Sequence, residues 1–307
     1  MKKILIATEK PFATIAVEKI KNVFNKAGYE TIMLEKYTDK SQLIDAIKDV
    51  DGMIIRSDIV SREVIEAAKN LKIIVRAGAG YDNIDMQACT EKSIVAMNTP
   101  GQNSNAVAEL VLGMMVYIAR NKFNGTSGTE LKDKTLGLHA YGFVAQNVAR
   151  IAKGFGMTIY AYDPYVTKDK IEKDGVCAVS SVESLYQQCQ YVSLHIPATN
   201  ETKKSINYNL LSKMPKGAVL VNSARKEVID EESLLKIFAE RPDFKYVTDV
   251  EPDCKEKLIS EYNDRYFATP KKMGAQTSEA NINAGIAAAE QIVRFFENGD
   301  RTFQVNK

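Results

Sequence analysis

The sequence lacks the features that mark metal-binding, membrane-spanning and nucleic-acid-binding proteins. Its four cysteines show no CxxC or Cys/His ligand spacing, so we expect reduced thiols and neither disulfides nor a metal site. Lys and Arg number 41 against 39 Asp and Glu, and this balance gives no electrostatic reason to expect nucleic acid or a membrane surface as a partner. The most apolar long stretch, residues 106–119, contains Glu109 and is shorter than the ~20 residues of a membrane span. The first residues, MKKILIATEKPF, hold an apolar run too short for a signal peptide, so we expect a cytoplasmic protein.

Short apolar runs alternate with amphipathic helical segments along most of the chain. At roughly 150 residues per domain, 307 residues predict two domains. A first series of runs, from KKILIAT to SIVAMN, is separated by segments such as AVEKIKNVFNKAG, which is the βαβ pattern of a parallel sheet covered by helices. After a long helix at 105–120, a second series runs from TLGLHAYG to RYFATP, and a last helix occupies 277–300. The sequence thus predicts an α/β protein of two doubly wound (Rossmann- or flavodoxin-like) parallel-sheet domains with a cleft between them, the last helix returning to the first domain.

The start of the second series has the outline of a dinucleotide-binding turn. Ala140, Gly142 and Ala145 occupy the three small positions of GxGxxG, so only the middle glycine, which allows close backbone approach to a pyrophosphate, is kept. A strand precedes this turn, a helix follows it, and Asp163 ends the next strand about twenty residues on. A carboxylate there accepts hydrogen bonds from the adenosine ribose and repels a 2′-phosphate, which predicts NAD rather than NADP. The alternative is that Asp163 only caps a turn before Pro164.

Six blocks, taken in order, resemble one known family. They are VRAGAGYDNID (75–85), NTPGQNSNAVAELVLGMM (98–115), YAYDPY, VSLHIPATNET (192–202), AVLVNSARKEVID (218–230) and GAQTSEA. Through them the chain resembles the D-isomer-specific 2-hydroxyacid dehydrogenases over nearly its whole length, and among these the short phosphoglycerate dehydrogenases without a regulatory C-terminal domain. The resemblance implies a substrate-binding domain of residues 1–98 and 281–307, an NAD-binding domain of residues 99–280, and a homodimer joined through the NAD-binding domains.

The resemblance also assigns residues to the substrate and to the cofactor. Arg225 matches the family's catalytic arginine, whose forked guanidinium holds the substrate carboxylate and polarises the carbonyl being reduced. Ala77 and Gly78 follow a strand where backbone N–H groups would form a nest for a carboxylate, with an ordinary turn as the alternative. Asp249 corresponds to a strand-end acid that contacts the nicotinamide carboxamide. The residues implied to contact the cofactor are Ala140, Gly142, Phe143, Val144, Asp163, His195, Pro197, Thr202, Ser223, Ala224 and Asp249.

The sequence departs from the family at the proton-transferring residue. The family usually has TPH, an apolar residue and GA, with a glutamate behind the histidine, whereas this chain has TPKKMGA. The only two histidines, His139 and His195, lie elsewhere, and we interpret the first as structural. We therefore expect a lysine to transfer the proton. During reduction the protonated lysine is already the acid, and during oxidation nearby like charges and burial would favour the neutral form that acts as the base. Counting from TP selects Lys271 and counting back from GA selects Lys272, which we favour, while Glu251 is a poor counterpart of the glutamate.

Two arginines suggest a phosphorylated substrate. Arg56 and Arg76 end consecutive apolar strands, and two cations suit a phosphate dianion, although pairing with local acids such as Asp58 and Asp82 is the alternative. The combined prediction is an NAD-dependent D-3-phosphoglycerate dehydrogenase of serine biosynthesis. Two other functions stay open: an enzyme acting on another small acid, such as glyoxylate or hydroxypyruvate, and a catalytically degenerate protein that binds NAD as a sensor.

Overall fold

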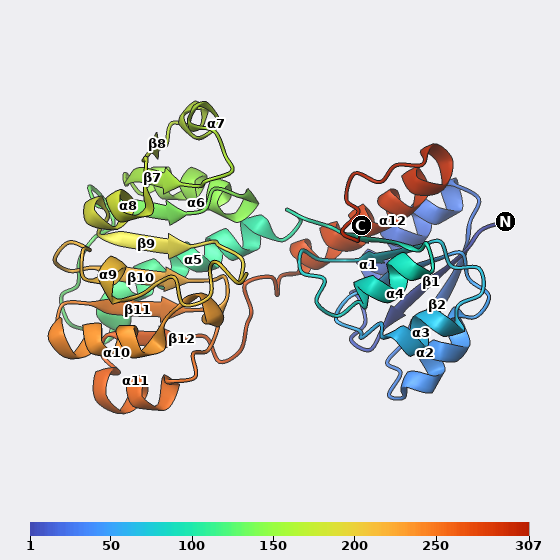
Figure 1. The fold of residues 1–307 in the computed structure, drawn as a ribbon, viewed down its shortest axis with the longest axis horizontal. Coiled ribbons are helices and arrows are strands. Elements are labelled where there is room, and N and C mark those ends of the chain that lie inside the picture. Colours follow the sequence, from blue (N-terminus) through green and yellow to red (C-terminus); the bar gives the residue numbers. More distant parts are fainter. Residues whose placement is uncertain (307) are drawn as a thin grey trace. The chain divides into compact units, whose positions relative to one another are not determined.

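The computed structural model describes residues 1–306 and divides into two compact units, each built on its own parallel sheet (Figure 1). Unit 1 comprises Met1–Asn103 together with the segment that starts at Ala275, and unit 2 is Ser104–Gly274. The predicted domain boundaries, after residues 98 and 280, differ from this division. The second falls inside the helix Ser278–Asn298, and because a continuous helix packs as one element, the chain changes unit in the loop before it.

Unit 1 contains a five-stranded parallel sheet in the order β2-β1-β3-β4-β5. Its strands are β1 (Lys3–Thr8), β2 (Glu30–Glu35), β3 (Gly52–Ile55), β4 (Ile73–Arg76) and β5 (Val95–Asn98). Its helices are α1 (Thr14–Lys26), α2 (Lys40–Ile47), α3 (Arg62–Ala67), α4 (Met86–Glu91) and α12 (Ser278–Asn298). Every apolar run of the first predicted series is a strand.

Side chains of β1 alternate between two separate cores, one on each face of this sheet. Ile4 and Ile6 belong to the core that includes residues of α1 and α12, whereas Leu5 and Ala7 belong to the core that includes residues of α2, α3 and α4. This follows from the two-residue period of a strand with both faces covered, and it explains why the run is continuously apolar.

The C-terminal part of the chain completes unit 1 in two ways. Helix α12 packs on α1, and a Cβ at Gly285 would lie only 2.7 Å from Cδ1 of Ile20, so glycine permits this close approach. After α12 the chain runs along the edge strand β5, where Gln304 pairs antiparallel with Met97. The side chain of Asn306 accepts a hydrogen bond from Ala96 N and donates one to Ile94 O. The exposed edge of the sheet is thereby covered.

Unit 2 contains a seven-stranded parallel sheet in the order β12-β11-β10-β9-β6-β7-β8. Its strands are β6 (Thr135–His139), β7 (Thr158–Tyr162), β8 (Cys177–Ala178), β9 (Tyr191–Leu194), β10 (Val219–Asn222), β11 (Lys245–Thr248) and β12 (Tyr266–Ala268). Its helices are α5 (Ser104–Ala119), η1 (Asn121–Phe123), α6 (Phe143–Gly154), α7 (Lys168–Lys173), α8 (Val182–Gln188), α9 (Tyr208–Leu211), η2 (Lys226–Val228), α10 (Glu231–Glu240) and α11 (Lys255–Tyr262). Two buried clusters fill the two faces of this sheet, and no helix among residues 1–306 combines the length and apolar character needed to cross a membrane.

The strand order of unit 2 fixes where a ligand would approach. From β6 the chain moves outward through β7 and β8, then crosses back to β9 on the other side of β6. The carboxyl ends of β6 and β9 therefore form the point where the strand order reverses, and ligands of open α/β sheets bind outside the strand ends at such a point.

Candidate active site

The turn after β6 and the loop after β9 lie together at this reversal point. His195 directly follows β9, and its N–H donates to the carbonyl of His139, the last residue of β6, at 3.0 Å. Ala140 and Gly142 form the turn between β6 and α6. The structure thus brings together the predicted pyrophosphate turn and the predicted cofactor residue of β9.

The turn itself fits a pyrophosphate. Gly142 is the N-cap of α6 and makes no side-chain cap, and a Cβ built on it would meet nothing within 4 Å. The N–H groups at the start of α6, where Phe143 and Val144 lie, form the positive end of the helix and attract a negative group. Ala140 has φ +80°, a left-handed conformation that glycine adopts freely and alanine does not. The alanine at the first position of the motif is therefore strained.

Asp163 joins the ends of two strands. Its Oδ2 accepts from Tyr141 N, in the turn after β6, and its Oδ1 accepts from Tyr165 N, both at 2.8 Å. The carboxylate thus lies directly beside the pyrophosphate turn. Its contact with the adenosine ribose stays a prediction.

Neither histidine suits a role as a proton donor at neutral pH. Burial lowers the pKa of His139 to about 4 and that of His195 to about 3. His139 Nδ1 lies 3.3 Å from the hydroxyl of Tyr186, and the buried Nε2 of His195 has no hydrogen-bond partner among the described residues. Both rings are neutral near pH 7.

The loop that carries Arg225 is folded by a residue that the sequence analysis did not select. Asn222, at the end of β10, is fully buried. Its Oδ1 accepts from Ala224 N and its Nδ2 donates to Arg225 O, both at 2.9 Å. Ser223 is buried in the same loop, and the half-buried guanidinium of Arg225 donates from Nη1 to Ala224 O at 2.9 Å. A polar residue closing the apolar run AVLVN was the available signal for Asn222.

Asp249 anchors the loop that bears the two lysines. This carboxylate, 1% exposed, follows β11 and accepts from Thr269 Oγ1, Met273 N and Gly274 N, each at 2.8 Å. The resemblance implied a contact between Asp249 and the nicotinamide, which stays a prediction, and the hydrogen bonds described for the carboxylate all hold the segment 269–274. Lys271 and Lys272 lie between the anchored ends of this loop, and both are exposed.

The remaining predicted residues of unit 2 lie in braced surface segments. Thr202 Oγ1 donates to Pro197 O at 2.5 Å and closes the loop after β9. The carboxylate of Glu251 lies 2.8 Å from Nζ of Lys255 in an exposed ion pair. An exposed pair of this kind contributes little energy, and we see no feature that prepares Glu251 for proton transfer.

In unit 1, the two predicted phosphate-binding arginines leave adjacent strands. Arg56 follows β3 and Arg76 ends β4, and Arg76 Nε donates to Arg56 O at 2.9 Å. The guanidinium of Arg56 donates to Lys10 O (3.1 Å), Pro11 O (3.2 Å) and Asn281 Oδ1 (2.5 Å), and it lies over the Phe12 ring.

The alternative pairing of Arg56 with Asp58 is not what the structure shows. The buried Asp58 carboxylate accepts instead from Tyr37 Oη at 2.8 Å, from Glu9 N at 2.7 Å and from the backbone N of Arg56 at 3.0 Å. Asp58 therefore folds the loops that follow β1, β2 and β3.

Ala77 and Gly78, where an anion nest is expected, both have backbone partners for their N–H groups in the structure. Ala77 N donates to Ile55 O and Gly78 N donates to Arg76 O, both at 2.8 Å, so both donors are engaged within unit 1. A Cβ at Gly78 would overlap Nη1 of Arg76. Glycine at this position therefore makes room for the Arg76 guanidinium, and binding of a substrate carboxylate by Ala77 and Gly78 stays a prediction.

With this geometry described, comparison with known proteins identifies the family. The description "D-isomer specific 2-hydroxyacid dehydrogenase, NAD binding domain" matches residues 107–270, which lie within unit 2. A D-3-phosphoglycerate dehydrogenase of Methanocaldococcus jannaschii is 39% identical over 82% of this chain and 51% of its own length. A hydroxypyruvate reductase of Thermotoga maritima is 38% identical over 89% of this chain and 92% of its own. The crystal structure of NAD+-bound 3-phosphoglycerate dehydrogenase of Entamoeba histolytica is 52% identical, with TM-score 0.88, covering 100% of this chain and 99% of that one.

These similarities establish an NAD-binding α/β oxidoreductase. The chain belongs to the D-isomer-specific 2-hydroxyacid dehydrogenase family and contains its NAD-binding domain. It spans about half the length of the phosphoglycerate dehydrogenases of M. jannaschii and Synechocystis.

Proposed function

We propose that the chain is an NAD-dependent dehydrogenase of D-3-phosphoglycerate, which it oxidises to 3-phosphohydroxypyruvate. The observation that carries the choice of substrate is the pair Arg56 and Arg76, which leave neighbouring strands at the same edge of the unit 1 sheet. Two guanidinium groups suit a phosphate dianion because each donates planar pairs of charged hydrogen bonds. The names of the M. jannaschii and E. histolytica relatives support the same substrate.

Each polar group has a separate task in this proposal. Bound NAD+ accepts the hydride that leaves the substrate carbon bearing the hydroxyl. Arg225, held by Asn222, binds the substrate carboxylate and polarises the neighbouring C–O bond. Lys271 or Lys272 removes the hydroxyl proton during oxidation and returns it during reduction. Asp249 positions this lysine through the loop that it anchors.

The test compares two keto acids that differ only by a phosphate. We expect NADH oxidation with 3-phosphohydroxypyruvate to show the higher kcat/KM, with hydroxypyruvate, glyoxylate and pyruvate as the comparison substrates. Replacing Arg56 and Arg76 by alanine should lower kcat/KM for the phosphorylated substrate ten- to a hundredfold per arginine, about 1.5–3 kcal/mol each, and should leave hydroxypyruvate nearly unaffected.

Arg62→Ala is the matched control. Arg62 lies in the same unit and forms an exposed ion pair with Glu91, so its loss should change neither substrate. Equal losses for both keto acids in the Arg56 and Arg76 variants would show that these arginines only stabilise unit 1.

A second candidate function is reduction of hydroxypyruvate. The T. maritima relative supports it, since that alignment covers nearly the whole of both chains. A kcat/KM for hydroxypyruvate at or above that for the phosphorylated acid would favour this function. Binding of NADH without turnover of any of the four keto acids would instead favour an NAD-sensing protein.

A further inference from the structure

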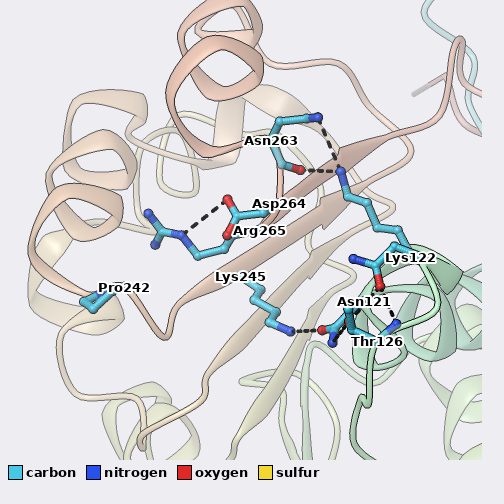
Figure 2. Close-up of a pocket in the computed structure, with 9 residues that line it drawn as sticks. Asn121, Lys122, Thr126, Pro242, Lys245, Asn263, Asp264 and Arg265 are labelled. Atoms are coloured by element: carbon cyan, nitrogen blue, oxygen red, sulfur yellow. Dashed lines mark hydrogen bonds and ion pairs between the residues drawn. The ribbon is translucent and has the colours of Figure 1, made fainter.

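A hollow in unit 2 lies at the edge of the sheet opposite the candidate active site (Figure 2). Its volume is 590 Å³, within the usual range of small-molecule sites. Lys245 is the first residue of β11 and Arg265 directly precedes β12, whereas Asp249 and Thr269 follow the carboxyl ends of the same strands. The length of a four-residue strand, about 13 Å, separates the two edges.

The lining of this hollow, which we name the basic pocket, carries an excess of positive charge. Lys122, Lys245 and Arg265 contribute cations, and Asp264 is its one carboxylate. That carboxylate is 79% exposed and lies 4.0 Å from Nε of Arg265. Asparagine amides and the hydroxyl of Thr126 supply further hydrogen-bond donors.

The two lysines bond only to neutral oxygens. Nζ of Lys122 donates to the backbone carbonyl and, at 3.4 Å, to Oδ1 of Asn263, and Nζ of Lys245 lies 3.3 Å from Ile118 O and 3.4 Å from Asn121 Oδ1 (Figure 2). Burial lowers the pKa of both lysines and outweighs the opposing effect of the Asp264 carboxylate. An ammonium group has three donors, which leaves each lysine able to bind a further acceptor.

The backbone that presents Lys122 is strained. Asn121, Lys122 and Phe123 are consecutive residues with φ of 48°, 56° and 57°. Left-handed conformation costs an L-residue roughly 1–2 kcal/mol, and only asparagine among these three tolerates it well. Strain of this kind persists only where the surrounding structure holds it in place, and it clusters at functional sites.

A purely structural role accounts for part of the pocket. Lys245 bonds a carbonyl in the last turn of α5, and Arg265 donates to Phe238 O and Arg241 O at the end of α10, as cations near helix C-termini commonly do. Lys122 likewise donates to the carbonyl of Asn263, the C-cap residue of α11. Capping explains these contacts, but it does not explain why three cations surround one hollow or why three consecutive residues are left-handed.

We propose that the basic pocket binds a small anion with more than one negative charge, a phosphate- or carboxylate-bearing metabolite, through Lys122, Lys245 and Arg265. This site is independent of the substrate and cofactor residues and of the proposed function. The anion supplies negative charge to three cations whose lining holds a single, largely exposed carboxylate, Asp264, and it stabilises the left-handed turn at Asn121–Phe123.

The test measures binding of pyrophosphate and, separately, citrate by calorimetry to the full chain saturated with NAD+, which removes the cofactor turn from competition. We expect saturable binding of at least one of these anions. The double variant Lys122→Gln and Lys245→Gln should weaken this binding at least tenfold, since each substitution removes a charge-assisted hydrogen bond. Stronger binding of pyrophosphate would indicate a phosphate-bearing ligand, and stronger binding of citrate a polycarboxylate.

Lys257→Gln is the matched control, because it removes the same charge from an exposed position on the neighbouring α11. Far-ultraviolet circular dichroism and the kcat of the enzyme assay establish that the variants are folded. The proposal is overturned if neither anion binds saturably, if the double variant binds as tightly as the parent, or if the control loses as much affinity. It is also overturned if the double variant changes the oligomeric state while anion binding persists, because the pocket would then belong to a subunit contact.

Discussion

Ala140 shows how a single methyl group bears on the cofactor turn. Its φ of +80° requires a conformation that glycine adopts without penalty. We expect Ala140→Gly to raise the free energy of unfolding by about 0.5–1 kcal/mol. Glycine relieves the strain of the folded turn, and this gain is partly offset because glycine also gives the unfolded chain more conformational entropy. Urea denaturation measures this change. The control is Ala145→Gly, at a buried helical position of α6, which should lower the free energy of unfolding. If Ala140→Gly also lowers it, the turn is not strained.

The lysines of TPKKMGA define the second prediction at this scale. Replacement of the proton-transferring lysine by alanine should lower kcat about 10²- to 10⁴-fold, while the Kd for NADH stays near its original value. The other lysine should matter less. Oxidation should become faster with rising pH, because the base must be unprotonated, and reduction should become slower over the same range. Full activity in both single variants would assign the proton to water or to another side chain.

The buried histidines predict how stability depends on pH. Burial lowers the pKa of His195 to about 3, whereas an unfolded histidine titrates near 6.5. The unfolded chain therefore binds a proton that the folded chain does not, and the free energy of unfolding decreases as pH falls below about 6.5. Between pH 7 and pH 5 we expect His195 to contribute about 2 kcal/mol of this decrease. Urea titrations at pH 7 and pH 5 measure this decrease in the parent and in His195→Gln, where it should be smaller by that amount. The same decrease in both proteins would contradict a buried, neutral His195.

At the scale of elements, the loop between β12 and α12 depends on one carboxylate. Asp249 accepts two backbone N–H groups, those of Met273 and Gly274, so Asp249→Ala should free both. We expect hydrogen exchange of these two amides to accelerate at least tenfold, since a charge-assisted hydrogen bond contributes roughly 1.5–3 kcal/mol. The kcat of this variant should fall, because the same loop bears Lys271 and Lys272. Thr269→Val removes only a hydroxyl donor and should have a smaller effect on exchange, and unchanged exchange in Asp249→Ala would mean that the loop is held by other contacts.

Sequence patterns predicted the elements better than the contacts at their ends. The apolar runs became strands because both faces of each sheet are covered, but β8, with only Cys177–Ala178, is too short to show any pattern. Spacing placed Asp163 at a strand end and the resemblance selected Arg225, yet neither shows which hydrogen bonds fold the loops nearby. Asp249 bonds residues far along the chain, and although Asn222 bonds its close neighbours Ala224 and Arg225, an apolar run that ends in asparagine does not reveal those partners. At Gly78 the sequence likewise did not show that the Arg76 side chain folds back over the glycine, and the contact of Gly78 with a substrate stays a prediction.

For the molecule as a whole, the two units differ in how many segments of the chain form them: unit 1 consists of two and unit 2 of one. Unit 2 is the single segment Ser104–Gly274 and has its own buried clusters on both faces of its sheet. We therefore expect residues 104–274, expressed alone, to unfold cooperatively and to bind NADH by calorimetry, since a domain with its own core folds by itself. Residues 1–103 alone should not fold stably, because α12 is missing from one face of their sheet. A fragment 104–274 without a cooperative transition would show that unit 2 requires unit 1.

The late position of α12 in the chain also bears on synthesis. The first 103 residues leave the ribosome with one face of their sheet covered by α1 alone, because the second helix that packs there ends only at Asn298. At the usual speed of translation this interval lasts about 10–40 s, long enough for the contiguous middle segment to complete its own folding first. During that time the core that contains Ile4, Ile54 and Ile73 lacks the residues of α12, so the nascent N-terminal segment is the part of the molecule on which a chaperone would act.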